Sequence, residues 1–331
     1  SLNPKDYQPP SHGCFTTTGK DLTFMQGTSM ATPNVAGAAA LVRQYFRTNW
    51  PVQSVDLDGP TVRALLINSC IQLPEGTVTP NIVYGHGKVD LSTVLPIDNN
   101  FGVQITHQVT SEQPSIKENS QMVATLKVNS NKVKVQITLS YLDPLINPTT
   151  VIPLTRDLDL IVKSPSGKIY KGDHLANNDT QHFSTNEKVI INTDQVEPGD
   201  YTIHIYSLAF LDSANNDTSE TQNFSVVATG DIENNYLQFS PAESCLCDEC
   251  DDNHHLHCKC DSNFIGPACQ TFIQTQKSTQ FSVTLKAHEI RRIYIKSANV
   301  FDNINYITNV QVDASDFGYS SVWIDKQCKL Q

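Results

Sequence analysis

Ser29 stands where the sequence predicts the start of a helix, in the run GTSMATPNVAG over residues 27–37. Thr28 and Ser29 are residue types that favour a helix N-cap, and Pro33 is expected in the first turn, where a missing N–H does no harm. Residues 35–42 are apolar on all sides, which predicts a helix buried in a larger body. A serine placed there has its own backbone N–H and the positive end of the helix dipole beside it. Those groups would stabilise an oxyanion if the hydroxyl attacked a carbonyl.

The alternative interpretation is a plain N-cap serine ahead of a core helix, because most such serines are only that. The run over 27–37, however, resembles the active-serine segment of the subtilisin-like serine peptidases, in which Gly-Thr-Ser-x-Ala-x-Pro surrounds the nucleophile. Asn34 stands where many members of that family have His. The resemblance implies that Ser29 is the nucleophile and that its N–H is one oxyanion donor. It also implies that Gly27 and Thr28 shape the nucleophile turn.

Two downstream segments resemble the end of the subtilase catalytic domain. Residues 60–69 begin with proline and predict a second helix with an apolar stripe. Residues 84–90, with glycines at 85 and 87, predict a turn that leads to a short closing helix. The expected fold of this part is therefore α/β, a remnant of the C-terminal end of a doubly wound parallel sheet.

The partners of a catalytic serine are not evident in the chain. A triad needs a base and a carboxylate, which subtilases carry in the order Asp, His, Ser. Only 28 residues precede Ser29, with His12 as their one histidine and Asp6 and Asp21 as their acids. One crossover connection takes about 10–12 residues, so this stretch cannot hold three side chains in register. We expect a C-terminal portion of a peptidase, inactive alone. Its partner is an N-terminal part of the catalytic domain that carries Asp, His and the oxyanion Asn, and the chemistry requires no cofactor.

The composition agrees with an extracellular protein, and the resemblance to subtilases implies that it acts on peptides or proteins. The formal net charge of −11 argues against binding to nucleic acid or an anionic membrane by electrostatics. No apolar run approaches the roughly 18 residues that span a bilayer. Sequons for N-glycosylation occur at Asn178, Asn216 and Asn223. The expected location is secreted or at the extracellular surface.

Six of the nine cysteines lie between residues 245 and 269. A span this short cannot bury enough apolar surface to fold unaided, so disulfides are expected to replace a core. Sequence alone leaves the pairing open. The second half, with Gly266 ahead of the last cysteine, resembles the closing signature of an EGF-like module. That resemblance implies the pairs Cys245–Cys250, Cys247–Cys258 and Cys260–Cys269.

A zinc cluster is the competing interpretation of this segment, because His254, His255 and His257 lie among the cysteines. The Cys-x-Cys spacing fits zinc poorly, so we expect these histidines to form a solvated loop. Cys14 and Cys70 both fall in the peptidase part and could pair. Cys328 would then be free or tied to something outside the chain.

Between residues 99 and 231 the pattern becomes strand-like. Apolar and polar residues alternate over 133–141, 158–162, 201–205 and 224–228, and turn residues separate these runs. Short strands with such turns predict an antiparallel sandwich or jelly roll. Residues 156–167 also resemble the β-barrel domain that follows the catalytic domain in one branch of subtilases. Together the family resemblances cover roughly residues 11–232.

Acidic residues of this β region suggest a structural calcium ion. Asp157, Asp159, Asp173 and Asp179 could supply the carboxylate oxygens that Ca²⁺ prefers. Relatives with this barrel are calcium-stabilised, and the resemblance extends that expectation to this chain. The alternative is that these residues line solvated strand ends, since Arg156 would oppose a nearby cation.

These observations predict five segments, which are listed here in chain order: 1–97, the C-terminal part of a subtilisin-like domain; 98–232, an all-β jelly-roll or sandwich domain; 233–244, a linker; 245–270, an EGF-like module; 271–331, a β-rich segment. The predicted function is that of a serine endopeptidase working through an acyl-enzyme on Ser29. The alternative is a non-catalytic extracellular adhesion protein that keeps the peptidase part as a scaffold.

Overall fold

This computed structural model describes residues 27–73, 80, 83–97, 100–106, 114–118, 120–144, 154–173, 184–210, 221–247, 249–250, 258–260, 264–265, 269 and 271–272.

The first part of the described chain is helical. Helix α1 (Thr28–Thr48) leads through an extended segment to helix α2 (Gly59–Asn68), whose Asp58 N-cap accepts a hydrogen bond from the Thr61 N–H. Strands β1 (Cys70–Ile71) and β2 (Lys88–Val89) then form a short antiparallel pair, followed by the 3-10 helix η2 (Leu91–Thr93). The sequence predicts a remnant of a doubly wound parallel sheet here, but the described residues of this part of the chain contain no parallel strands.

Two sheets follow, and their strands account for most of the structure. One sheet has the order β13-β5-β10-β7-β8, and the other has the order β12-β3-β11-β6-β9, with β4 paired to β11. The strands of the first sheet are β5 (Gln121–Val128), β7 (Arg156–Lys163), β8 (Ile169–Lys171), β10 (Gly199–Phe210) and β13 (Ser240–Pro241). Those of the second are β3 (Gly102–Thr106), β4 (Ser115–Lys117), β6 (Val135–Tyr141), β9 (Asn186–Ile191), β11 (Thr221–Gly230) and β12 (Asn235–Leu237).

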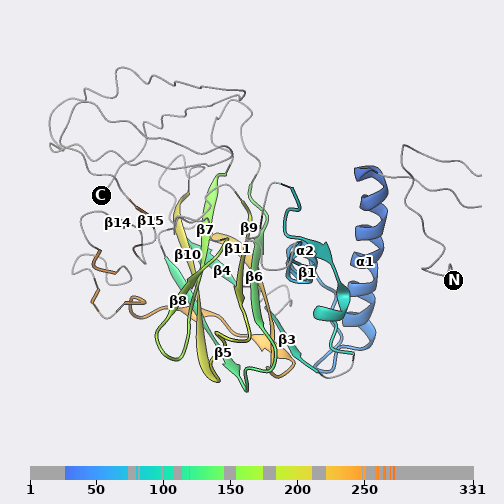
Figure 1. Cartoon of the computed structure of the whole chain (residues 1–331). Coiled ribbons are helices and arrows are strands. Elements are labelled where there is room, and N and C mark those ends of the chain that lie inside the picture. The colour runs from blue at the N-terminus through green and yellow to red at the C-terminus, as the bar shows by residue number, and fades with distance from the viewer. Residues whose placement is uncertain are drawn as a thin grey trace, which may run out of the picture.

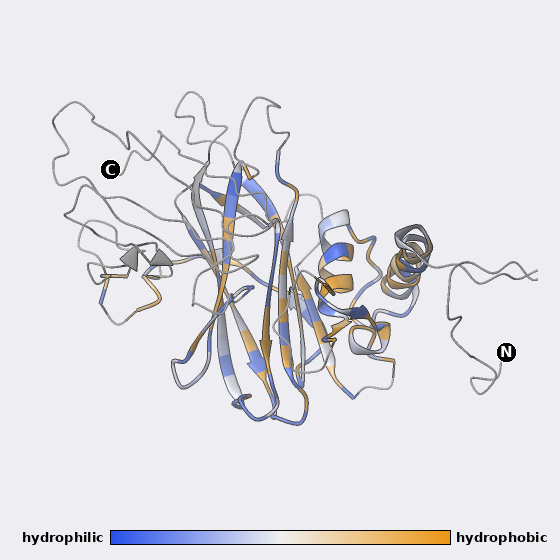
Figure 2. Cartoon of the chain, turned by 45° about the horizontal axis from the view of Figure 1, so that its top comes forward, coloured by the Kyte–Doolittle hydropathy of each residue, from blue (hydrophilic) through white to orange (hydrophobic). Residues whose placement is uncertain are grey.

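The two sheets enclose the main apolar core. Alternate residues of each sheet point into it, such as Leu160 and Ile203 from one sheet and Ile137 and Val226 from the other. Figure 2 shows the corresponding alternation of apolar and polar residues along the strands. The segment expected to be a linker, 233–244, contains β12 and β13, which pair with β3 and β5.

The peptidase part and the β domain share a second core. Figure 1 shows helix α2 between the second sheet and helix α1. Phe46 of α1 and Leu65 of α2 pack in one cluster with Val103 and Ile105 of β3 and Val227 of β11. The outer face of the second sheet is thus covered by protein. For this reason every residue of β6 is buried, whereas its alternating sequence predicts a half-buried strand.

The cysteine-rich segment lies against the first sheet, on the side away from the helices (Figure 1). Leu246 packs on Ile161 and Tyr206, and the Lys163 ammonium donates a 3.0 Å hydrogen bond to the Leu246 carbonyl. Strand β14 (Phe264–Ile265) of this segment pairs with strand β15 (Thr271–Phe272), which follows the last of its cysteines.

Candidate functional site

Ser29 is the second residue of α1, and its side chain is exposed. The residue that caps the helix is Gly27, rather than Thr28 or Ser29, and its carbonyl accepts hydrogen bonds from the N–H groups of Met30 and Ala31. Gly27 has a φ of 137°, a backbone conformation that residues with a Cβ rarely adopt. The glycine of the motif is therefore required by the backbone that turns the chain into the serine helix.

Pro33 lies beyond the first turn, which corrects the expectation drawn from the sequence. It is the sixth residue of α1, so the carbonyl of Ser29 lacks the N–H that would normally bond to it from four residues ahead. Two polar side chains nearby bond back along the helix. The Thr32 hydroxyl donates to the Thr28 carbonyl at 2.9 Å, and the Asn34 amide donates to the Met30 carbonyl at 2.8 Å. The helix continues through proline to Thr48.

Within the described residues, no base lies in hydrogen-bonding contact with the Ser29 hydroxyl. His204 is bonded to Gln121 and Thr202 in the β domain. His86 is largely buried, and burial followed by the nearby charge of Lys188 lowers its pKa to about 4. The only histidine ahead of the serine, His12, lies outside the described residues, as do Asp6 and Asp21.

Among the described residues, helix α1 is packed against other segments only in its C-terminal half. Val42 and Phe46 are its buried residues, and the Phe46 ring packs on Trp50 with a centroid distance of 4.7 Å. Val35 and Leu41 are 41% and 55% exposed. The helix predicted to be buried on all sides therefore has an open apolar side in this structure, because no described segment covers its N-terminal turns.

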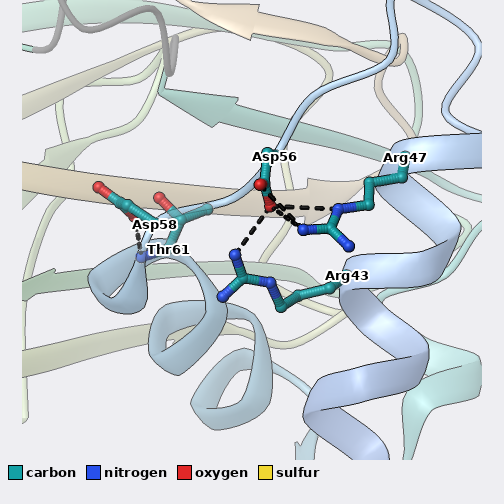
Figure 3. Close-up of polar contacts among 5 residues, drawn as sticks. All are labelled: Arg43, Arg47, Asp56, Asp58 and Thr61. Carbon is teal, nitrogen blue, oxygen red and sulfur yellow. Dashed lines mark hydrogen bonds and ion pairs between the residues drawn. The ribbon is translucent and has the colours of Figure 1, made fainter.

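An ion-pair network fastens α1 to the segment before α2 (Figure 3). Asp56 accepts hydrogen bonds from Arg43 at 2.8 Å and from Arg47 at 2.8 and 2.9 Å. The hydrogen bond from Arg43, followed by that from Arg47, lowers the pKa of the exposed Asp56 carboxyl. Together with the Asp58 cap, this network fixes where α2 starts relative to α1.

The carboxylates named as calcium ligands are buried rather than lining solvated strand ends. Asp157 and Asp159 lie on β7 and Asp173 follows β8, with exposed fractions of 8%, 0% and 1%. Asp179 lies outside the described residues. Among the residues that the structure describes, no three or more such side chains are arranged to hold a metal ion.

A further carboxyl, which was not identified from the sequence, joins this cluster. Glu187 of β9 is fully buried and accepts a hydrogen bond from the Leu160 N–H at 2.5 Å. Burial raises its pKa well above the usual value, and the charges of Asp159 and Asp173 add to this effect. The sequence pattern could have predicted that Glu187 is buried, because it falls on the same face of its strand as the apolar Val189 and Ile191.

The cysteine-rich segment contains three disulfides, Cys245–Cys250, Cys247–Cys258 and Cys260–Cys269, the pairs that the resemblance implied. Cys70 is buried as a free thiol, so it is not paired with Cys14. Of the three sequons, Asn223 is exposed on β11, and Asn178 and Asn216 lie outside the described residues. No helix within the described ranges is long and apolar enough to cross a membrane.

Ser29 therefore lies exposed in the first turn of α1, where a hydroxyl has the backbone N–H groups of the helix start beside it. Comparison with known proteins gives the family. The model of the Subtilase family, a peptidase family, matches residues 11–92. Residues 11–92 are therefore a subtilase segment, as the motif around Ser29 predicts.

The chain is also similar to a serine protease/ABC transporter B family protein, tagA, of Dictyostelium discoideum. The two sequences are 24% identical over 269 residues, which is 75% of this chain and 14% of the relative. The chain thus spans a small part of the length of that relative. The match extends well beyond the subtilase segment and includes residues of the β domain.

Proposed function

We propose that this chain provides the nucleophile of a subtilisin-like serine endopeptidase, with Ser29 as the attacking residue. The observation that carries the proposal is the exposed position of Ser29 at the start of α1, within the segment matched by the subtilase family. Gly27 supplies the backbone conformation that starts the helix there. Thr28 precedes the serine and shapes the same turn.

The chemistry follows from this placement. The Ser29 oxygen attacks the carbonyl carbon of the scissile peptide, while its proton passes to a histidine and from there to the leaving amine. The oxyanion of the tetrahedral intermediate is stabilised by the Ser29 N–H and the positive end of the helix dipole. Water then attacks the acyl-enzyme, and the same histidine takes the proton of the water and returns it to Ser29. In this proposal the histidine and its aspartate come from polypeptide outside the chain.

The exposed apolar side of α1 is evidence for a partner that completes the catalytic domain. Val35 and Leu41 expose apolar surface on a helix that otherwise consists largely of small residues. Exposure of this apolar surface to water is unfavourable, and burial against an apolar partner would be favourable. We propose that the N-terminal part of the catalytic domain, which carries Asp, His and the oxyanion Asn, covers this side.

A fluorophosphonate probe tests the function. The expected result is covalent labelling of Ser29 in the complete protein, loss of labelling in Ser29→Ala, and no labelling of the 331-residue chain by itself. Labelling that persists in Ser29→Ala would place the nucleophile elsewhere. A complete protein that carries the Asp and His but leaves Ser29 unlabelled would favour the second candidate, a non-catalytic extracellular adhesion protein built on a peptidase scaffold.

We propose a secreted or cell-surface setting with an EGF-like module over residues 245–270. Support comes from the three disulfides, since such bonds persist in oxidising compartments. The exposed Asn223 is a site for glycosylation in that setting. Peptide mapping before and after glycosidase treatment tests it, and an unmodified Asn223 in the secreted protein would remove this part of the proposal.

A structural calcium ion remains a proposal for the carboxyl cluster. Buried carboxylates of like charge repel one another unless they bind protons or a cation. Asp173 and Glu187 each have one buried carboxyl oxygen without a hydrogen-bond partner. If calcium binds there, a chelator lowers the melting temperature and added Ca²⁺ restores it. An unchanged melting temperature would show that protons alone neutralise the cluster.

A further inference from the structure

The interface between α2 and the β domain is polar, although it is buried. The outward-facing residues of β6 are Gln136, Thr138 and Ser140, which are at most 2% exposed. Their alternation with apolar residues is typical of a strand whose outer face is in water. In this structure helix α2 covers that face instead. A buried polar face is costly unless its groups are paired, so this face is built for one particular partner.

Asn68, the last residue of α2, is the centre of the pairing. Its side-chain amide donates to the Thr229 hydroxyl at 2.9 Å, and its side-chain oxygen accepts from the Thr138 hydroxyl at 2.9 Å. Its backbone carbonyl accepts from the Gln136 amide at 3.2 Å. Asn68 is fully buried, so these hydrogen bonds form away from water.

Lys188 of β9 binds the carboxyl end of the same helix. Its ammonium donates to the carbonyls of Ile67 at 2.8 Å, Asn68 at 3.1 Å and Cys70 at 3.4 Å. The carbonyls of Ile67 and Asn68 carry the negative end of the helix dipole, which a cation stabilises, and that of Cys70 belongs to strand β1 just beyond the helix. Lys188 is only 4% exposed, so its charge is stabilised by this helix end and by the nearby Asp173 carboxyl rather than by solvent.

A third contact lies one to two turns earlier on the helix. The Arg63 guanidinium donates from Nε to the Ser140 hydroxyl at 2.8 Å and from Nη2 to the Tyr141 carbonyl. These polar contacts hold α2 to the sheet from Arg63 to Asn68, which fixes both its rotation and its position.

The orientation of α2 is passed on to the serine helix through packing. Phe46 and Trp50 lie in the cluster that also contains Leu65 of α2 and Ile105 of β3. The Asp56 network holds α1 to the segment that enters α2. Among the described residues the N-terminal turns of α1 have no other support, so these contacts set the angle of the helix that presents Ser29. In the complete protein, the N-terminal part of the catalytic domain proposed above would add its own contacts to the same turns.

We infer that the β domain is a positioning element for the peptidase site, with Lys188 as its principal positioning residue. Lys188 and the polar row of β6 hold α2, and α2 holds the helix that carries Ser29. The expected effect on catalysis rests on the proposed function, whereas the coupling of Lys188 to α1 through α2 is a property of the fold. A displacement of about 1 Å at a reacting group can cost on the order of a hundredfold in rate.

The test compares Lys188→Met with Lys188→Arg in the complete protein. Methionine has nearly the length of lysine but lacks its charge and its hydrogen-bond donors, whereas arginine keeps the charge and the donors. Lys127→Met is the matched control, because Lys127 is an exposed lysine of β5 in the other sheet. Hydrogen exchange by mass spectrometry follows the amides of α1 and α2 well below the melting temperature. Active-site titration gives the number of reactive serines, and steady-state kinetics give kcat and KM per reactive site.

Lys188→Met is expected to speed amide exchange at least tenfold in α2 and in α1. It is also expected to lower kcat per titrated site on the order of tenfold with KM unchanged. Lys188→Arg should recover part of both effects, and Lys127→Met should show neither. If Lys188→Met does not fold, Thr138→Val removes one hydroxyl bond to Asn68 and should give the same pattern more weakly.

A merely structural role for Lys188 would lower the melting temperature and the number of titrated sites, yet leave kcat per site unchanged. That result, or unchanged exchange in α1, overturns the inference. If the wild-type protein has no titratable serine, the proposed function fails instead. The hydrogen-exchange data then test by themselves whether Lys188 is coupled to α1.

Discussion

The anchoring of the serine helix predicts a contrast between two substitutions on the same helix, Phe46→Ala and Leu41→Ala. The Phe46 side chain is 0% exposed and packs on the Trp50 ring, whereas Leu41 is 55% exposed. Replacing a buried Phe by Ala costs about 3–5 kcal/mol through lost transfer free energy and the cavity left behind. Full burial of a Leu is worth about 1.5–3 kcal/mol, so a side chain more than half exposed loses at most about 1 kcal/mol.

Urea unfolding of the 331-residue chain, followed by far-UV circular dichroism, measures both changes. Circular dichroism is preferred to tryptophan fluorescence because Trp50 touches the mutated ring. Phe46→Ala should lower the free energy of unfolding by at least about 2 kcal/mol more than Leu41→Ala does. Equal losses would show that the C-terminal half of α1 is not what holds the helix.

The same pair also tests the proposed partner. If the N-terminal part of the catalytic domain covers the open side of α1, Leu41 is buried in the complete protein. Leu41→Ala should then cost about 2–3 kcal/mol there, while remaining nearly neutral in the isolated chain. A substitution that is equally mild in both would argue that nothing covers this side of the helix.

Three further changes probe other parts of the structure. Burial lowers the pKa of His204 from 6.5 to about 4, so the folded state resists its protonation and stability is lost as the pH falls from 6.5 towards 4. At about 1.4 kcal/mol per pKa unit this loss amounts to about 3–4 kcal/mol. His204→Asn should flatten the acid limb of the plot of stability against pH, and parallel pH profiles would contradict it. Gly87→Ala should destabilise by about 1–3 kcal/mol, because a Cβ there would lie 2.1 Å from the Ile71 carbonyl oxygen at a φ of 113°. Gly37→Ala is its control: a Cβ on this α1 glycine meets nothing within 4 Å, so denaturation should show a gain of about 0.5–1 kcal/mol in the isolated chain. Asp56→Ala should lower the stability only slightly, since its ion pairs are exposed, and the loss should vanish in 1 M salt; a loss that persists at high salt would mean that the carboxylate does more than pair with arginines.

Several features were determined by the sequence alone, because they depend on residues close together in the chain. The run around Ser29 is a local motif, and its resemblance to the subtilases agrees with the family match over residues 11–92. The strand pattern likewise depends on a period of two residues, and strands lie at or near the runs that showed it. Local patterns placed the start of α2 within one residue but placed the cap of α1 less well. The capping position shifted to Gly27, because the φ of 137° there is a property of the folded backbone.

Only the tertiary structure decided which side chains meet across long separations. The polar row of β6 gives the same alternation whether water or a helix covers it, so the sequence could not show that α2 binds there. Glu187 joins Asp159 and Asp173 because β9 closes against β7, a contact between segments that are far apart in the chain. Periodicity determines which face a residue occupies, whereas the packing of distant segments determines what that face touches. The position of Lys188 at the end of α2 is a consequence of packing in the same way.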